Sequence, residues 1–136
     1  MKTIICGGRN NHITDEDKIY LNHLKETLPI THVVSGGAVG VDMEALLWAV
    51  ENDLEYTIEF AKWDDISYPD AIIKTRKDGT EYDVRAGFRR NEKMSEMADA
   101  CVALKGGTGT KHMFNTAKKK GLLIFSNYFM DEEDGT

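Results

Sequence analysis

Three glycine-rich segments of this chain each follow directly on a short apolar run. Each run has the length and composition of a buried β-strand, and the glycines mark the turn that ends it. The segments are Cys6-Gly7-Gly8-Arg9, Ser35-Gly36-Gly37-Ala38-Val39-Gly40 and Lys105-Gly106-Gly107-Thr108-Gly109-Thr110. This repetition constrains the fold strongly, because a strand, a tight turn and a helix must recur in the same order along the chain.

The alternation of strand-like and helical patterns predicts the fold class. Strand-like runs lie at residues 3–6, 32–35, 56–60, 100–104 and 122–125, and helical patterns lie at residues 15–28, 41–52, 88–98 and 110–120. Each helix is long enough to connect two parallel strands. We therefore predict an α/β fold, a Rossmann-like three-layer sandwich with a mainly parallel central sheet of about five strands.

The chain length of 136 residues fits one domain with one core. We expect this domain to span residues 1–129, with an inserted flap or hairpin at about residues 62–87. Within that long connection, Lys77-Asp78-Gly79-Thr80 carries the Asp-Gly signal of a hairpin turn. Residues 130–136 are mostly acidic and have no apolar anchor, so we expect a flexible tail there.

Composition and charge argue against several classes of protein. No apolar run approaches the about 20 residues of a membrane span, and no signal-peptide pattern is present, so the predicted location is cytoplasmic. A net charge of -6 argues against nonspecific binding to nucleic acid, which depends on clustered Lys and Arg. Cys6 and Cys101 lie in separate apolar runs without nearby metal ligands, which predicts reduced, buried thiols and no metal site.

The glycine-rich turns are expected at one edge of the sheet, where the carboxyl ends of parallel strands border a ligand crevice. Helices that begin there have free backbone N–H groups, and glycine lets an anion approach them closely. One Gly-Gly pair is most often only a tight turn, but three in register indicate a phosphate-binding crevice. The spacing fits neither a Walker P-loop nor G-x-G-x-x-G, so ordinary dinucleotide binding is not indicated.

Several side chains near these turns can pair with phosphate oxygens. The hydroxyl and cationic candidates are Ser35, Thr108, Thr110, Arg9, Arg89, Arg90 and Lys111. A solvated surface position is the alternative for Arg89 and Lys111. Asp42 either caps the helix that follows the second turn or contacts a ribose hydroxyl or base. Trp63 either stacks on a base or packs within the protein.

Together these motifs resemble the SLOG superfamily, named for the SMF/DprA and lonely-guy proteins, and especially its small YspA-like members. The resemblance covers nearly the whole chain. The matching elements are Gly7-Gly8-Arg9, Val33-Val34-Ser35-Gly36-Gly37-Ala38 with Gly40 and Asp42, Ala61 with Trp63, Arg90-Asn91 with Met94, and Ala98-Asp99-Ala100 followed by Gly106-Gly107-Thr108-Gly109-Thr110-Lys111-His112-Met113. The resemblance implies a Rossmann-related fold that holds a nucleotide or a nucleotide-derived ligand, without a required cofactor. Val39 stands where YspA-like members often have Arg, which implies one fewer phosphate-facing cation.

The lonely-guy branch of this superfamily contains phosphoribohydrolases with the motif Pro-Gly-Gly-x-Gly-Thr-x-x-Glu. In this chain Lys105 and Met113 replace the Pro and the Glu. Because methionine cannot transfer a proton, hydrolysis would require another acid to face the ribose. The candidates are Glu92, Glu96 and Asp42. His112 adjoins the missing glutamate, but a histidine at a helix start is more often a capping or surface group.

We predict from these motifs a module that senses or sequesters a nucleotide-like ligand. Residues 106–110 and Arg90 are expected at its phosphate, and the second turn with Asp42 near its ribose. The predicted ligand-binding residues are Gly7, Gly8, Arg9, Ser35, Gly36, Gly37, Asp42, Trp63, Arg90, Asn91, Gly106, Gly107, Thr108, Gly109 and Thr110. The alternatives are a nucleotide N-glycosidase or phosphoribohydrolase, and a DprA-like module for single-stranded DNA, which the acidic composition disfavours.

A homodimer is also consistent with the resemblance, because the wider superfamily commonly dimerises through its helical faces. Apolar residues of the second predicted helix can supply such a face or can be buried in the core. The residues in question are Met43, Leu46, Leu47 and Trp48.

Overall fold

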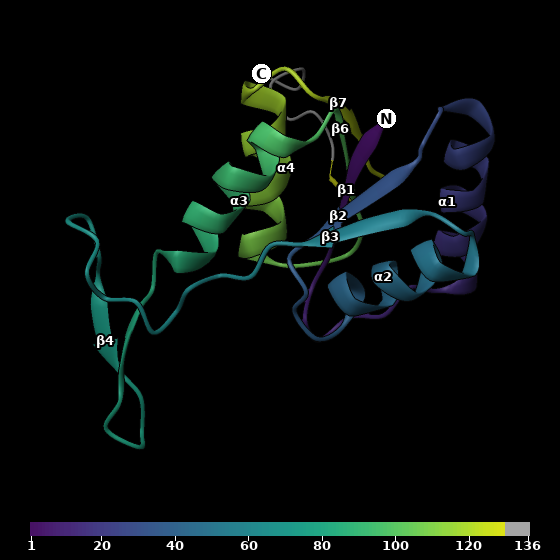
Figure 1. The fold of residues 1–136 in the computed structure, drawn as a ribbon. Coiled ribbons are helices and arrows are strands. Elements are labelled where there is room, and N and C mark those ends of the chain that lie inside the picture. Colours follow the sequence, from purple (N-terminus) through teal and green to yellow (C-terminus); the bar gives the residue numbers. More distant parts are fainter. Residues whose placement is uncertain (130–136) are drawn as a thin grey trace.

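The computed structural model describes residues 1–129, in which a five-stranded parallel sheet forms the centre of the fold. Its strands are β1 (Lys2–Cys6), β2 (His32–Ser35), β3 (Glu55–Ile58), β6 (Ala100–Ala103) and β7 (Leu123–Phe125). They lie in the order β3-β2-β1-β6-β7, so the chain first builds the sheet outward in one direction and then restarts beside β1 (Figure 1). The predicted Rossmann-like three-layer sandwich is confirmed.

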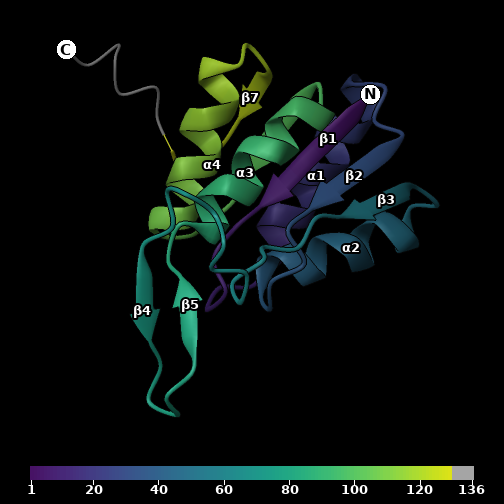
Figure 2. The ribbon, with the colours of Figure 1, turned by 60° about the vertical axis from the view of Figure 1, so that its left-hand side comes forward.

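Helices α1 (Asp15–Thr27) and α2 (Val41–Glu51) cover one face of the sheet, and α3 (Ala86–Met97) and α4 (Thr108–Lys119) cover the other (Figures 1 and 2). Neighbouring residues of β1 point to opposite faces, as strand geometry requires. Ile5 therefore packs with Leu21, Trp48 and other residues of α1 and α2. Ile4 packs in a second cluster with residues of α3 and α4. The predicted burial of both cysteines is confirmed.

Helix α2 divides the four apolar residues considered for a dimer interface. Leu46 and Trp48 are 6% and 3% exposed and belong to the core, which is the second of the two alternatives given for them. Met43 and Leu47 are 42% and 59% exposed. The reason is helical geometry, since residues three or four apart share a face and only one face of α2 meets the sheet.

Several element boundaries differ from the sequence-based prediction. Helices α3 and α4 begin at Ala86 and Thr108, two residues before the predicted starts. In α4 this places Gly109 in the first turn, where N–H groups need no intrahelical acceptor and glycine is tolerated. Strand β3 ends at Ile58, so Phe60 lies beyond the sheet. At the other end of the described chain, the aromatic rings of Phe129 and Phe114 stack with centroids 5.9 Å apart.

The connection between β3 and α3 contains a hairpin that projects from the sandwich (Figure 2). Its antiparallel strands are β4 (Ile73–Thr75) and β5 (Glu81–Asp83), and the Asp78-Gly79 signal marks its turn, where Gly79 has φ of +90°. The base of the hairpin is held by the fully buried Asp83. The Asp83 carboxylate bonds Arg89 of α3 at 2.8 Å and accepts the N–H groups of Arg85 and Ile72.

The anchoring of the hairpin by Asp83 is expected to fail in acid. Burial raises the pKa of Asp83, but the hydrogen bonds from Arg89 and the backbone outweigh it, so the pKa lies below its ordinary value. A lowered pKa contributes stability that is present at neutral pH and is lost as pH falls below about 4. We expect Asp83→Asn to lower the melting temperature at neutral pH by more than it does in acid. Melting curves against pH for both proteins test this.

Asp64 provides the control, because it pairs with Arg76 of the hairpin but its side chain is 85% exposed. Exposed ion pairs contribute little, so Asp64→Asn should leave the melting temperature almost unchanged at every pH. A stability difference for Asp83→Asn that does not change with pH would contradict an ionic anchor.

Within residues 1–129, no helix has the length and apolar character that crossing a membrane requires. The acidic tail expected at residues 130–136 lies outside the described residues.

Candidate functional site

A cavity of about 450 Å³ opens where the strand order reverses, beyond the carboxyl ends of β1 and β6. This is the position at which open parallel sheets bind ligands. Its lining comes from the turn after β1, from α2, from the hairpin connection, and from the beginnings of α3 and α4. The lining residues are Cys6, Gly7, Gly8, Arg9, Asn10, Asn11, Ala38, Asp42, Trp63, Val84, Gly87, Phe88, Arg90, Asn91, Met94, Gly107, Thr108, Gly109, Thr110 and Met113.

The beginning of α4 is open to this cavity. Gly107 is the N-cap residue, makes no side-chain cap, and its carbonyl accepts the N–H of Lys111. The N–H groups of Thr108, Gly109 and Thr110 consequently lack intrahelical acceptors. All three residues line the cavity, and the beginning of α3 lines it as well through Gly87 and Phe88. Two helix dipoles thus direct their positive ends toward one space, which favours an anion.

The beginning of α2, by contrast, is closed. The N–H of Val41 donates to the Gly8 carbonyl, and that of Met43 donates to the Ala38 carbonyl. The buried Ser35 hydroxyl donates to the Asp42 carbonyl and accepts the Gly37 N–H. Of the predicted site residues, Ser35, Gly36, Gly37 and Gly106 do not line the cavity. The second glycine-rich turn therefore supports the wall of the site rather than presenting N–H groups to it.

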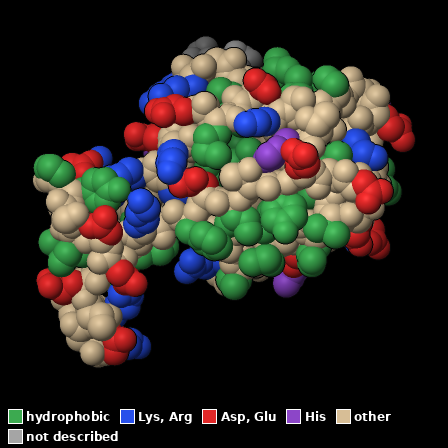
Figure 3. Space-filling model, viewed as in Figure 1, with side chains coloured by type: hydrophobic (Ala, Val, Ile, Leu, Met, Phe, Trp, Pro, Cys, Tyr) green, Lys and Arg blue, Asp and Glu red, His purple; other side chains and the backbone are tan. Residues whose placement is uncertain are grey.

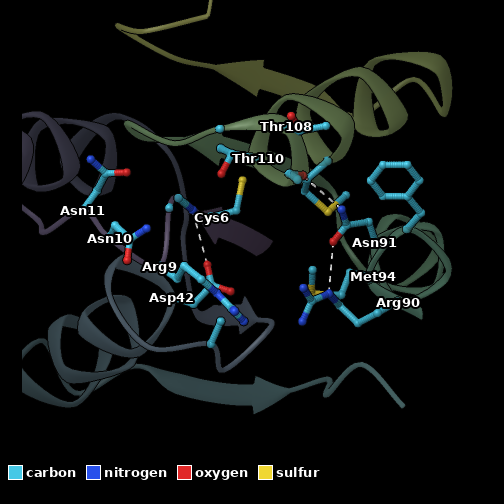
Figure 4. Close-up of a pocket in the computed structure, with 18 of the residues that line it drawn as sticks. Cys6, Arg9, Asn10, Asn11, Asp42, Arg90, Asn91, Met94, Thr108 and Thr110 are labelled. Atoms are coloured by element: carbon cyan, nitrogen blue, oxygen red, sulfur yellow. Dashed lines mark hydrogen bonds between the residues drawn. The ribbon is translucent and has the colours of Figure 1, made fainter. Parts of the chain in front are cut away.

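Asp42 connects two of the glycine-rich turns. Its carboxylate accepts the N–H of Gly7 at 3.3 Å, and it is only 5% exposed (Figure 4). It does not form the N-cap of α2, because that position is Gly40. Burial raises the pKa of Asp42, while the charge of Arg90 and the N–H groups of Gly7 and Ala38 oppose this rise. The result is a desolvated carboxyl group in the wall of the cavity.

Arg90 lies near Asp42 and is held by α3 and by main-chain oxygens. Its Nη1 donates to the carbonyls of Gly36 at 2.9 Å and Glu59 at 3.4 Å, and its Nε donates to Asn91 Oδ1 at 3.0 Å. Burial lowers the pKa of Arg90, and the nearby Asp42 carboxylate opposes this change. Among residues 1–129, Nη2 of Arg90 has no hydrogen-bond partner, which leaves it a donor for a ligand.

Asn91 links α3 to the beginning of α4. Its Nδ2 donates to the Gly109 carbonyl at 3.2 Å and lies 3.2 Å from His112 Nδ1, while its Oδ1 accepts from Arg90 (Figure 4). His112 stacks on Phe88 with ring centroids 3.9 Å apart, and burial lowers its pKa. This histidine does not line the cavity. Its contacts are those of a neutral packing residue that receives a hydrogen bond from Asn91.

The floor of the cavity is apolar. Met94 and Met113 are each 1% exposed, and both line the cavity together with Cys6. The pKa of Cys6 is raised well above its ordinary value, chiefly by a hydrogen bond with the Cys101 thiol and to a smaller extent by burial. A thiol with a raised pKa is a poor nucleophile. The floor therefore offers a surface for packing and no reactive group.

No family model, curated protein or solved structure matches this chain. The chemistry of the site consequently rests on the geometry of its own residues. Among residues 1–129, no group of three or more His, Cys, Asp or Glu side chains is arranged to hold a metal ion.

Some of the predicted phosphate ligands and acids have other partners. Arg89 pairs with Asp83 at 2.8 Å and with Asp70 at 2.7 Å. Glu96 pairs with Lys120 at 3.5 Å. Neither Arg89 nor Glu96 lines the cavity, and the same is true of Lys111 and Glu92. Asp42 is the one carboxylate among residues 1–129 that does.

Sequence reasoning missed the opposite rims of the cavity. Asn10 and Asn11 extend the first glycine-rich turn, and their amides are hydrogen-bonding groups that a base or phosphate can use. Val84, Gly87 and Phe88 form the other rim with Trp63, whose indole lies directly against Gly87. The Asn10-Asn11 pair next to Gly7-Gly8-Arg9 was a usable signal. The second rim had none, because the hairpin connection brings it into place.

Proposed function

We propose that this protein binds a phosphorylated, nucleotide-like ligand, with the phosphate at the beginning of α4. The observation that carries the proposal is the beginning of α4, where Thr108, Gly109 and Thr110 line the cavity and their N–H groups have no intrahelical acceptors. A second observation supports it, since Nη2 of the half-buried Arg90 has no hydrogen-bond partner among residues 1–129. Both features supply positive charge in a partly desolvated space, where it attracts an anion most strongly.

The size and walls of the cavity suit the remainder of a nucleotide. Its volume of about 450 Å³ lies within the range of small-molecule sites. Asp42 is placed to accept hydrogen bonds from ribose hydroxyl groups, and Trp63 offers an indole face to a base. Met94 and Met113 supply an apolar floor. A place in the SLOG superfamily, whose members hold such ligands, forms part of this proposal.

Calorimetry with a panel of ligands tests the proposal. The panel contains nucleoside mono- and diphosphates, cyclic nucleotides and ADP-ribose, each compared with its unphosphorylated nucleoside, and quenching of tryptophan fluorescence serves as a second readout. We expect binding that requires the phosphate. Equal binding of nucleosides and nucleotides would contradict a phosphate site at α4, and the absence of binding by every compound would contradict the proposal as a whole.

The residues that line the floor of the cavity favour binding of the ligand without its hydrolysis. Met113 occupies the position of the lonely-guy glutamate, and its thioether can neither donate a proton nor stabilise a cation as a carboxylate does. His112 is turned away from the cavity into contacts with Phe88 and Asn91. We therefore favour a module that senses or sequesters its ligand.

A nucleotide N-glycosidase is the second candidate, because the buried Asp42 carboxylate does face the cavity. In this reaction water adds to C1′ of the ribose, the N-glycosidic bond breaks, and the base leaves with a proton. Release of the free base from a nucleoside monophosphate, detected by chromatography, would support this activity. Asp42→Asn should then reduce the release by about 100-fold or more, the scale of a lost acid or base group. Release that Asp42→Asn leaves unchanged would exclude Asp42 as the acid.

A further inference from the structure

The charge of Arg9 is not used by the protein itself. Arg9 lines the cavity and is exposed, and it has no hydrogen bond or ion pair among residues 1–129. Arg89 differs, since it pairs with Asp70 and Asp83 at the base of the hairpin. In Figure 3 the Lys and Arg side chains around that base accordingly lie among those of Asp and Glu. Arg9 is therefore a cation that is available to a ligand.

Arg9, Asp42 and Arg90 lie together in the wall of the cavity. Figure 4 shows their side chains directed toward one another. Burial lowers the pKa of Arg90, and the like charge of Arg9 lowers it further. Burial raises the pKa of Asp42, and the charges of both arginines oppose this rise. Two positive charges thus stand beside one carboxylate, which leaves positive charge in excess.

This group of charges is separate from the beginning of α4. Arg90 is held by the carbonyl of Gly36, which follows β2, whereas α4 follows β6. Strands β2 and β6 pair with opposite edges of β1, and neighbouring strands lie about 4.7–4.9 Å apart, so the two positions are about 9–10 Å apart. In Figure 4, Thr108 and Thr110 lie across the cavity from Arg9. One phosphate group is too small to bind at both positions.

We propose that the ligand carries a second phosphate on its ribose, and that Arg9 and Arg90 bind this phosphate. The inference rests on the proposed function, in which one phosphate lies at the beginning of α4 and the ribose lies near Asp42. A phosphate on the 2′ or 3′ oxygen of that ribose then stands next to both arginines. The substrate class is a nucleoside bisphosphate, with its other phosphate on the 5′ oxygen.

The chemistry of the two arginines fits this group. A guanidinium presents paired N–H donors in the geometry that phosphate oxygens accept, and arginine near a ribose is a known solution for a 2′-phosphate in Rossmann folds. Asp42 alone would repel a phosphate, but the two positive charges outweigh its negative charge. The ribose hydroxyl that carries no phosphate can still donate a hydrogen bond to Asp42.

Calorimetry of the full chain with four compounds tests this inference. They are the 5′-monophosphate, the 2′,5′-bisphosphate, the 3′,5′-bisphosphate and the 5′-diphosphate of adenosine, and the guanosine series is measured in the same way. We expect at least one bisphosphate to bind about tenfold or more tightly than the monophosphate, the scale of charge-assisted hydrogen bonds. The 5′-diphosphate should gain less, because its second phosphate is attached to the first. Arg9→Gln should abolish the gain of the bisphosphate, and Arg9→Ala replaces this variant if it does not fold.

Arg76→Gln is the matched control, because it removes the same charge from the hairpin and Arg76 does not line the cavity. It should keep the wild-type gain. Bisphosphates that bind no more tightly than the monophosphate would overturn the second phosphate position while leaving the one at α4 intact. Failure of every compound to bind would instead contradict the proposed function, and this inference with it. A gain that Arg9→Gln preserves, that Arg76→Gln abolishes, or that the 5′-diphosphate equals would also overturn the inference.

Discussion

Gly109→Asp should weaken binding of the phosphorylated ligand by about 100-fold or more, which corresponds to roughly 2.7 kcal/mol. Gly109 lies in the first turn of α4, and its N–H has no intrahelical acceptor. Apart from its chain neighbours and the backbone of α4 itself, no atom lies within 4 Å of the position of an added Cβ. A carboxylate therefore fits there without a clash. It would stand beside the proposed phosphate and repel it, and it could accept the N–H groups that the phosphate would otherwise use. Calorimetry of both proteins with the same nucleotide measures the change.

The same substitution should raise the stability of the free protein. A negative charge in the first turn of a helix interacts favourably with its dipole, by about 0.3–1 kcal/mol. Binding and stability therefore change in opposite directions, which separates a ligand site from a merely structural role. Gly109→Asn is the control, because it adds a similar volume without a charge and should retain most of the affinity. Equal losses for both variants would contradict an electrostatic site at α4.

The sequence was sufficient to predict the fold because its patterns are local. Strand and helix periods alternate along the chain, and such alternation produces a parallel sheet with helices on both faces. The Asp78-Gly79 pair likewise marked the hairpin turn without knowledge of its surroundings. Burial of Cys6 and Cys101 followed from their positions in central strands. None of these inferences requires knowledge of which loops contact one another in the folded protein.

The geometry of the site depends on contacts between loops that are distant in the sequence, and the sequence was less informative about these contacts. Three glycine-rich turns looked alike, yet the turn before α4 leads into an open helix N-terminus at the cavity, whereas the turn before α2 leads into a closed one. Ser35 points into the protein, and Asp42 binds the N–H of Gly7 across the site instead of capping α2. Both outcomes depend on how the turn after β1 fits against the turn after β2. Spacing along the chain does not encode that contact.

The glycines in these turns are similar in the sequence pattern but are required for different physical reasons. An added Cβ on Gly106 would lie 2.7 Å from the Gly8 nitrogen, and one on Gly8 would lie 3.1 Å from the Gly106 Cα. The N–H of Gly8 also donates to the Lys105 carbonyl at 2.8 Å. These glycines are needed because two backbones pack against each other. Gly107 and Gly109 have open space instead, so the glycines available to a ligand are the later ones.

Gly40→Ala should be among the most destabilising single substitutions in the chain. Gly40 has φ of +87° and ψ of -135°, a conformation that is essentially restricted to glycine. An added Cβ would also lie 2.5 Å from the Gly8 carbonyl oxygen and 2.7 Å from that of Arg9. The strain and the clash together should cost at least about 4 kcal/mol, a large part of the 5–15 kcal/mol that stabilises a typical domain. Chemical denaturation measures this loss directly.

Two other glycines separate strain from clash. Gly79→Ala adds a Cβ at φ of +90° in open space, so it should cost only the conformational strain, about 1–2 kcal/mol. Gly109→Ala adds a Cβ in open space in the first turn of α4, where alanine should be neutral or slightly stabilising. The expected order of destabilisation is therefore Gly40, then Gly79, then Gly109. If Gly40→Ala and Gly79→Ala cost the same, the close packing of the turn after β1 against the beginning of α2 would contribute little. The closed N-terminus of α2 would then need another explanation, because the Gly8 carbonyl accepts the Val41 N–H only while those backbones stay in contact.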